Sequence, residues 1–426
     1  MRFPIKPSLY ITSLLLFPLL LSSQTKDDSV FTKIYSKYKN VVVRLENSQG
    51  VGSGFLTSEG FIITADHVVG TSVSAQMNYN GMHFFLHTCY RDHANDIAIL
   101  YPSGYYIDSE DDYREVPYDF LKGKSKITVG MMEMKADDRI MLMGYPYGIV
   151  EVKRILGTYK DEVYRYMENV PLYACDLPVI KGCSGGPVFN NKEEVIGIAV
   201  KFETKPTDTD YLISYVSPAK NIAKIMKSID KEYMKTIEKV NKNIMGFDVT
   251  KKNLINPKPK YYAQKNTKTI TENGSEFVIN KNDTGYYSYS DPGLVSVNVF
   301  FDIYLESIVG KKTDATSYVE IYLKWRDEDN YISMVMDMDK NSYYFLYRVD
   351  GNNTTQEPMV KMPIVSETKY NFEFYTISNT IGVYFDNIPV FYDHNLPFDT
   401  GALGIYFSQM KTMIIQDILL RIPKSF

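Results

Sequence analysis

The first half of the chain alternates short apolar runs with turn residues. Phe61–Ile63 and Ile97–Leu100 are two of these runs, and Gly, Asn and Asp separate them from their neighbours. Runs this short predict β-strands of the kind that build barrels. From Pro218 to Val240 the pattern changes, because apolar residues recur at the spacing of one helix face. These positions are Ile222, Ile225, Met226, Ile229, Tyr233 and Ile237.

A polar segment separates this predicted helix from the second half of the chain. Residues 241–266 are rich in Lys and Asn and contain two prolines, which is typical of a linker. From about Thr267 to Phe426, strand-like runs follow one another with turn residues between them and almost no helical pattern. Such a series predicts a two-sheet β-sandwich. The runs are Glu276–Ile279, Tyr286–Tyr289, Leu294–Leu305, Tyr318–Trp325, Tyr331–Met336, Tyr343–Val349, Tyr370–Tyr375, Ile381–Phe385, Val390–Tyr392, Leu403–Phe407 and Met413–Leu420.

Residues 1–23 have the three parts of a secretory signal peptide. Arg2 and Lys6 give a positive start, residues 9–21 are mostly apolar, and small residues follow near a cleavage point. The apolar part is shorter than the roughly 20 residues that a membrane-spanning helix needs, so an uncleaved anchor is the less favoured alternative. No cysteine precedes Cys89, which excludes a lipoprotein signal. We therefore expect an exported, soluble protein that is periplasmic, on the cell surface or secreted.

Charge and cysteine content narrow the classes of partner and cofactor. The chain has 47 Lys and Arg against 51 Asp and Glu, and no basic cluster, so a nucleic-acid partner is not expected. Its three cysteines, Cys89, Cys175 and Cys183, are an odd number without zinc-type spacing. We interpret them as small buried thiols, with a Cys175–Cys183 bridge as an alternative. No metal or organic cofactor is expected.

Three residues of the first half supply the groups of nucleophilic catalysis. Ser184 lies in KGCSGGPVFNN (residues 181–191), where small residues let the backbone turn sharply and leave the hydroxyl exposed. His67 follows one apolar run and Asp96 opens another. A serine hydroxyl needs a base such as imidazole, and the imidazole needs a carboxylate that fixes its tautomer. The order His, Asp, Ser therefore predicts a catalytic triad.

Simpler interpretations exist for each of these residues. An aspartate before an apolar run is often a turn residue, and GxSGG can be a flexible turn alone. His83, His87, His93 and His394 are interpreted as histidines without a catalytic role. His93 is the main rival base because it lies three residues before Asp96, but its surroundings, RDHAND, are polar and typical of a loop. A cysteine nucleophile at Cys183 is the other alternative.

At these residues the chain resembles a trypsin-like serine peptidase of the HtrA (Deg) type, over about residues 30–230. The matching segments are GSGF (52–55), ITADHVV (63–69), DIAIL (96–100), DRIMLMGYP (138–146), VIGIA (195–199) and YVSP (215–218). The resemblance implies a chymotrypsin-like double β-barrel. Two features depart from the family: Cys183 replaces the usual asparagine before the serine, and the PDZ module that usually follows is not apparent.

The resemblance also implies the surroundings of the triad. The backbone N–H groups of Gly182 and Ser184 would form the oxyanion hole, and Pro178, Ala199 and Val200 would line the primary substrate pocket. Trypsin-like enzymes that cut after Lys or Arg carry an acid at the position of Pro178. We therefore expect cleavage after small or medium aliphatic residues. HtrA relatives are often trimers, so an oligomer is compatible with the resemblance.

The second half resembles a concanavalin A-like (laminin-G or jelly-roll) domain. The similar segments are Trp325–Asp337, Thr380–Asp393 and Gly401–Leu420. Such domains often bind glycans or proteins. A glycoside hydrolase is not expected here, because such enzymes need paired carboxylates and Glu320 has no second acid nearby on its strand face.

These patterns together predict a mainly β protein with four parts. They are a signal peptide (1–23), a chymotrypsin-like double-barrel peptidase domain (30–230), a helix extension with a linker (231–266) and a jelly-roll β-sandwich domain (267–426). The expected function is that of an exported serine endopeptidase, with a C-terminal module that recruits it to a glycan or a surface protein. The alternatives are an inactive peptidase homologue and a lectin-like adhesin, both acting as binding proteins.

Overall fold

The structure is a computed structural model in which most of the chain is described. The described residues are 28–47, 50–69, 74–129, 134–165, 170–203, 213–245, 254–255, 261–263, 276–289, 296–307, 316–377 and 379–423. The predicted signal peptide and much of the predicted linker lie outside these ranges. Within the described residues, no helix has both the length and the apolar character that crossing a membrane requires.

Six strands of the first half close into a barrel. Pairing between β3 and β6 joins the two ends of the order β3-β2-β1-β4-β5-β6. Both faces of β3 are buried, which agrees with its apolar sequence. A single helical turn, α2 (Asp66–Val69), follows this strand. The strands are β1 (Val42–Asn47), β2 (Gly50–Leu56), β3 (Ile62–Thr64), β4 (Ser74–Tyr79), β5 (Met82–Asp92) and β6 (Ile97–Tyr106).

A second closed barrel follows in the chain, with the strand order β10-β13-β12-β11-β8-β9. The prediction of a mainly β, chymotrypsin-like pair of barrels is confirmed. The strands are β8 (Arg139–Gly144), β9 (Lys153–Arg165), β10 (Val170–Asp176), β11 (Pro187–Asn190), β12 (Val195–Glu203) and β13 (Ile213–Pro218).

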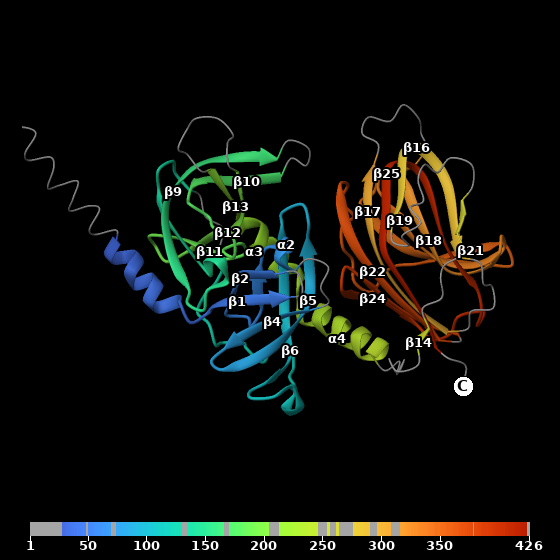
Figure 1. Cartoon of the computed structure of the whole chain (residues 1–426), viewed down its shortest axis with the longest axis horizontal. Helices are drawn as coiled ribbons and strands as arrows, with labels where there is room; N and C mark the ends of the chain where they lie inside the picture. The colour runs from blue at the N-terminus through green and yellow to red at the C-terminus, as the bar shows by residue number, and fades with distance from the viewer. Residues whose placement is uncertain are drawn as a thin grey trace, which may run out of the picture.

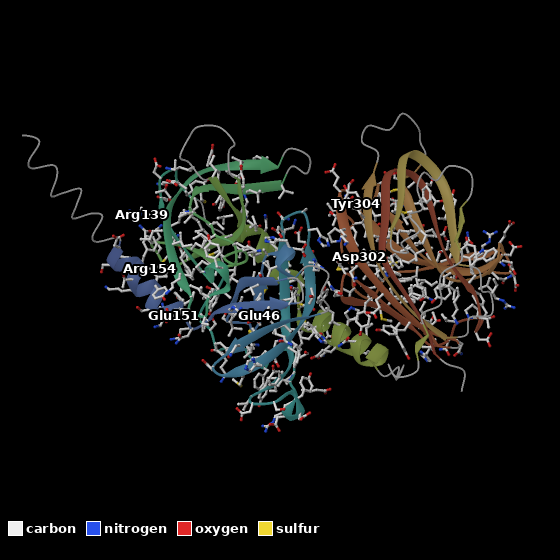
Figure 2. All side chains as sticks on the ribbon, in the orientation of Figure 1. Glu46, Arg139, Glu151, Arg154, Asp302 and Tyr304 are labelled. Carbon is white, nitrogen blue, oxygen red and sulfur yellow. The ribbon has the colours of Figure 1, made fainter. Side chains whose placement is uncertain are left out.

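A helix at residues 28–38 precedes the first barrel and packs against the second. Phe31 and Ile34 are fully buried. Two arginines of the second barrel reach this helix, as their positions in Figure 2 indicate. Arg139 Nη2 lies 3.1 Å from Asp28 Oδ1, and Arg154 Nη1 donates to Thr32 Oγ1 at 2.6 Å. The helix is therefore part of the first half of the fold.

The predicted helix after the second barrel is divided in two. Helix α3 (Ala219–Ser228) lies against β12 and β13, and α4 (Lys231–Met245) contacts both halves of the chain. The division falls at Asp230, whose carboxylate accepts a hydrogen bond from the backbone N–H of Tyr233 at 2.8 Å and so caps the start of α4.

The second half consists of antiparallel strands in two facing layers. Strand β25 (Ala402–Pro423) pairs with β16 (Glu276–Tyr289), β17 (Ser296–Ser307) and β18 (Tyr318–Asp327). Phe345 of β20 stacks on Phe391 of β24 at 3.8 Å between ring centroids, although β20 is next to one end of the strand order and β24 is at the other end. The other described strands are β14 (Leu254–Ile255), β15 (Tyr261–Ala263), β19 (Asn330–Asp337), β20 (Ser342–Val349), β21 (Asn352–Gln356), β22 (Thr368–Ile377), β23 (Thr380–Phe385) and β24 (Ile388–Asp393). The specific likeness to concanavalin A stays a prediction.

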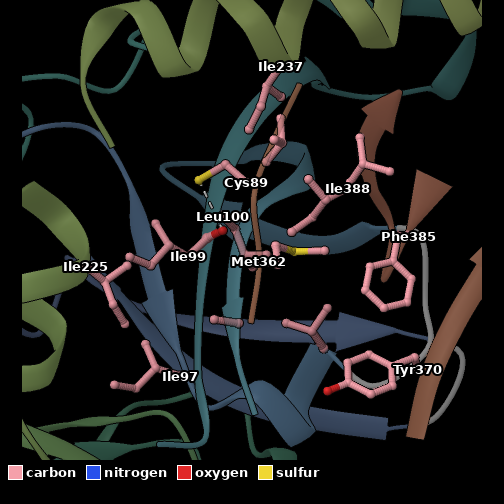
Figure 3. Packing of buried hydrophobic residues seen from close by; sticks show 14 of the residues in the cluster. Cys89, Ile97, Ile99, Leu100, Ile225, Ile237, Met362, Tyr370, Phe385 and Ile388 are labelled. Carbon is pink, nitrogen blue, oxygen red and sulfur yellow. Dashed lines mark hydrogen bonds between the residues drawn. The ribbon is translucent and has the colours of Figure 1, made fainter. Parts of the chain in front are cut away.

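The two halves lie side by side, with α4 between them (Figure 1). Tyr233 of α4 donates to the carbonyl of Cys89 on β5 at 2.7 Å, and Tyr384 of β23 donates to Asn241 on α4 at 2.6 Å. Figure 3 shows Cys89 and Leu100 of the first barrel, Ile237 of α4, and Met362 and Ile388 of the second half within one buried cluster. The second half is thus packed onto the first barrel through a shared apolar core.

Candidate active site

His67 and Asp96 come together at one end of the first barrel. His67 lies in the turn α2, and Asp96 adopts a positive φ of 53° in the turn that leads into β6. The imidazole Nδ1 lies 2.7 Å from Asp96 Oδ2, and the backbone N–H of His67 donates to Asp96 Oδ1 at 2.9 Å. Two contacts therefore fix both the position and the orientation of the ring.

The environment of His67 raises its pKa above the ordinary value. Burial of the ring lowers the pKa, but the hydrogen bond to Asp96 and the negative charges of Asp96 and Asp66 outweigh this effect. The side chain nevertheless keeps 49% of its surface exposed. A basic imidazole with one edge held by a carboxylate and the other accessible suits the role of a general base.

His93 is not an exposed loop residue and does not compete for the role of base. Its side chain is 10% exposed and lies between the carboxylates of Asp66 and Asp386. Burial lowers its pKa, but the two carboxylates raise the pKa to about 10, so His93 is a cation at neutral pH. An imidazole that is protonated at neutral pH cannot accept the proton of a serine.

Ser184 sits on the loop between β10 and β11, and Ser53 of β2 ties that loop to the first barrel. The backbone N–H of Ser53 donates to the carbonyl of Ser184 at 2.8 Å. The buried hydroxyl of Ser53 donates to the carbonyl of Gly182 at 2.7 Å and accepts from the N–H of Tyr145 at 2.9 Å. One residue of the first barrel therefore binds the serine loop of the second.

Gly185 brings the serine loop against the segment that carries His67. A Cβ at this position would lie 2.2 Å from Thr64 Oγ1 and 2.7 Å from the backbone nitrogen of Ala65. Its φ of +82° belongs to the left-handed region that favours glycine. Position 185 therefore requires glycine for two reasons. The serine loop packs against Ala65, which lies two residues before His67 in the chain.

The backbone N–H groups predicted to form the oxyanion hole belong to a loop that neighbouring hydrogen bonds hold in place. Gly182 has a φ of +94°, and the loop is held by bonds from Cys183 N–H to Ile180 and from Gly185 N–H to Ala199. Across the described residues, neither the N–H of Gly182 nor that of Ser184 donates to a protein acceptor. In the same part of the chain, no hydrogen bond joins the hydroxyl of Ser184 to the ring of His67.

The predicted pocket residues differ in exposure. Pro178 is exposed, whereas Ala199 and Val200 are buried. The backbone of Ala199 pairs with the serine loop on both sides, because it accepts from Gly185 at 2.7 Å and donates to Gly186 at 3.0 Å. This strand therefore lies directly behind the loop, while the role of the three side chains in substrate recognition stays a prediction.

All three cysteines are free and buried, as interpreted from the sequence. Burial raises the pKa of Cys183 to about 11 and that of Cys175 to about 12. A thiol with such a pKa is almost entirely protonated at neutral pH and a poor nucleophile. The alternative of a cysteine nucleophile at Cys183 is therefore not favoured.

The structure brings in two acids that the sequence analysis did not single out. Asp66 lies beside His67 in the chain and is bound by Arg91 and His93. Asp386, from the turn between β23 and β24, contacts the same two cations. The signal for Asp66 was its place in the ADH segment, but nothing in the sequence connected Asp386 to the site.

The family comparison agrees with this geometry. Residues 52–198 match a family model described as Trypsin-like peptidase domain. The matched residues include all three members of the predicted triad.

Similar curated proteins are serine endoproteases of the DegP type. A "Probable periplasmic serine endoprotease DegP-like" from Pseudomonas putida is 26% identical over 165 residues, which cover 38% of this chain and 31% of that protein. A protein of the same description from Rhizobium meliloti is 27% identical over 193 residues, covering 42% and 33%. "Protease Do-like 2, chloroplastic" from Arabidopsis thaliana is 27% identical over 173 residues, covering 39% and 26%. The chain spans about a third or less of the length of these relatives.

Comparison with solved structures also finds partial matches to two proteases. The serine endoprotease from Yersinia pestis is 18% identical, with a TM-score of 0.36, and the match covers 46% of this chain and 65% of that one. The inactive form of the Rv3671c protease is 19% identical with a TM-score of 0.37, covering 47% and 94%.

Proposed function

We propose that this protein is an exported serine endopeptidase. His67, Asp96 and Ser184 form its catalytic triad, and the backbone N–H groups of Gly182 and Ser184 form its oxyanion hole. The observation that carries the proposal is the pair His67 and Asp96, which is joined by two hydrogen bonds. The serine loop is held beside this pair through Ser53 and Gly185. The DegP-type relatives, whose names describe periplasmic serine endoproteases, support both the activity and export.

The chemical steps follow from these positions. The hydroxyl of Ser184 attacks the scissile carbonyl while His67 Nε2 takes its proton, and Asp96 stabilises the charged ring through Nδ1. The oxyanion forms against the N–H groups of Gly182 and Ser184, each typically worth about 2.7–4 kcal/mol in the transition state. His67 then protonates the leaving amine, and water hydrolyses the acyl-enzyme.

The missing bond between Ser184 and His67 is compatible with this mechanism. Catalytic hydrogen bonds are often long in proteins without substrate and tighten when the substrate is bound. We propose that binding of a polypeptide substrate brings the hydroxyl to the ring. Small or medium aliphatic residues before the cut are the proposed preference, because no acid stands at Pro178.

A fluorophosphonate probe tests the proposal, because it reacts only with an activated serine. We expect labelling of the full chain and none of Ser184→Ala. Ser36→Ala is the matched control, since the Ser36 hydroxyl is exposed and donates only to its own helix at Thr32. Labelling that persists in Ser184→Ala, or absence of labelling in the wild type together with no cleavage of unfolded casein, would contradict the proposal.

The second half is proposed to bind a glycan or a protein, as concanavalin A-like domains do. The full-length Ser184→Ala variant on a glycan array is the direct test. Binding would support a lectin role, and silence would leave a protein ligand as the proposal to pursue.

A further inference from the structure

Four buried charged side chains join the two halves of the chain beside the proposed triad. Asp66 and Asp386 supply carboxylates, and Arg91 and His93 supply the cations. Their side chains are between 1% and 10% exposed. Three of them belong to the first barrel, whereas Asp386 comes from the turn between β23 and β24.

Each cation bridges the two carboxylates. Arg91 donates from Nε to Asp66 Oδ1 at 2.5 Å and from Nη1 to Asp386 Oδ1 at 3.3 Å. His93 places Nδ1 2.6 Å from Asp66 Oδ2 and directs Nε2 to Asp386 Oδ2. With His93 protonated, the cluster holds two positive and two negative charges and is neutral.

Two residues of the cluster are directly connected to members of the proposed triad, one along the chain and one through a hydrogen bond. Asp66 directly precedes His67 in the turn α2. The carbonyl of His93 accepts a hydrogen bond from the backbone N–H of Asp96 at 3.3 Å. The two cations that bind Asp386 therefore also hold the residue before His67 and the turn that carries Asp96.

Asp386 is itself held firmly in place. Its N–H donates to the carbonyl of Asn371 at 2.6 Å, and Asn371 donates its own N–H to Asp386 Oδ1 at 3.2 Å. Tyr370 packs edge-on against the ring of His93 at 5.0 Å between centroids. Breaking a buried ion pair by removing one partner leaves an uncompensated charge, so this cluster is sensitive to loss of Asp386.

We propose that Asp386 is a positioning residue for the peptidase site: by anchoring Arg91 and His93 it fixes Asp66 and the Asp96 turn, and so sets the geometry of His67 against Ser184. The second half is then part of the working enzyme and not only a recruiting module. The inference rests on the proposed triad. The proposal predicts an effect on the rate of reaction at Ser184 and little effect on the affinity for substrate, because no residue of the cluster has been placed in the substrate pocket.

The test is the rate of fluorophosphonate labelling of the full chain as a function of probe concentration. Asp386→Asn removes the charge with little change in shape. We expect its maximal labelling rate to fall roughly 10–100-fold, since a small displacement of catalytic groups has effects of this size. The probe concentration at half-maximal rate should stay within about twofold, which a general loss of the site would not produce.

Two matched controls separate this role from domain docking. Asp393→Asn makes the same change on β24, where the carboxylate binds Tyr347 within the second half. Tyr384→Phe removes one hydrogen bond to α4 at the same boundary between the halves. Both should label at the wild-type rate. An unchanged rate in Asp386→Asn, or equal losses in all three variants, would overturn the proposal.

If Asp386→Asn does not fold, the double variant Arg91→Gln/Asp386→Asn, which removes one positive and one negative charge, takes its place. A wild-type labelling rate in this double variant would overturn the proposal. An NMR titration of ¹³C-labelled histidines in the full chain gives a readout that needs no activity. We expect Asp386→Asn to lower the pKa of His67 as its bond to Asp96 loosens, and an unchanged His67 would count against the inference. If the wild type is not labelled and does not cleave unfolded casein, the triad is refuted, while this titration still tests the link from Asp386 to His67.

Discussion

The hydroxyl of Ser53, on the first barrel, donates a hydrogen bond to the carbonyl of Gly182 on the second at 2.7 Å. The same hydroxyl accepts from Tyr145, and the N–H of Ser53 binds the carbonyl of Ser184. The proposed nucleophile, Ser184, and the proposed base, His67, lie on different barrels, so their separation depends on contacts that cross between the barrels. Ser53 provides three such contacts from one fully buried position.

Ser53→Ala should weaken both stability and activity. It leaves the carbonyl of Gly182 and the N–H of Tyr145 without partners, a cost of about 1–3 kcal/mol in the free energy of unfolding. The oxyanion segment also loses its anchor, so kcat/KM should fall roughly 10–100-fold. Urea denaturation and casein cleavage measure the two effects. Ser36→Ala is the control and should change stability by less than about 0.5 kcal/mol; equal behaviour of the two variants would refute the role of Ser53.

Gly185→Ala and Gly81→Ala form a matched pair. Both glycines have a positive φ, +82° and +78°, but a Cβ at Gly81 meets nothing within 4 Å, whereas at Gly185 it meets Ser53 O at 2.2 Å. We expect Gly81→Ala to cost about 1–2 kcal/mol from backbone conformation alone. Gly185→Ala adds overpacking and should cost roughly 2–5 kcal/mol with loss of labelling. Thermal unfolding of both variants checks this, and similar losses would mean that the close packing is unimportant.

Asp96→Asn should lower kcat by about 10⁴-fold while the protein stays folded. The amide presents its NH₂ or C=O to Nδ1 without a negative charge, so the ring loses both its tautomer control and its charge stabilisation. Steady-state cleavage of a peptide substrate gives the comparison. Asp108→Asn, an exposed acid away from the site, should keep the wild-type rate. A loss below tenfold in Asp96→Asn would argue against its place in the triad.

The pH dependence of cleavage should report the raised pKa of His67. The base must be neutral to accept a proton, so activity rises as His67 loses its proton, with a midpoint above the ordinary value of 6.5. Raising the pH has the opposite effect on the stability of the fold. Because the folded pKa is raised, protonated His67 stabilises the fold below about pH 6.5, and this contribution is lost as the pH rises through the folded pKa. In Asp96→Asn the midpoint of residual activity should move down, and an unchanged midpoint would point to another base.

Several elements could be predicted because their patterns are local. The apolar runs gave the strands around His67 and Asp96, and the Gly-rich segment gave the serine loop. Strand β21 (Asn352–Gln356) was absent from the predicted runs, because all five of its residues are exposed and carry no apolar signal. Strand β25 was predicted as two runs, since the polar Ser408 and Gln409 interrupt its apolar pattern.

Sequence alone determined which groups are available: an imidazole, a carboxylate and a hydroxyl in the order of a trypsin-like domain, with glycines that only a tight loop requires. The tertiary structure decided which acids act on which cations. His93 was interpreted as an ordinary loop residue, yet it is buried between Asp66 and Asp386, and Asp386 was only part of a predicted hairpin. Contacts between residues nearly 300 positions apart leave no local pattern, because they arise only when the two halves of the chain pack together.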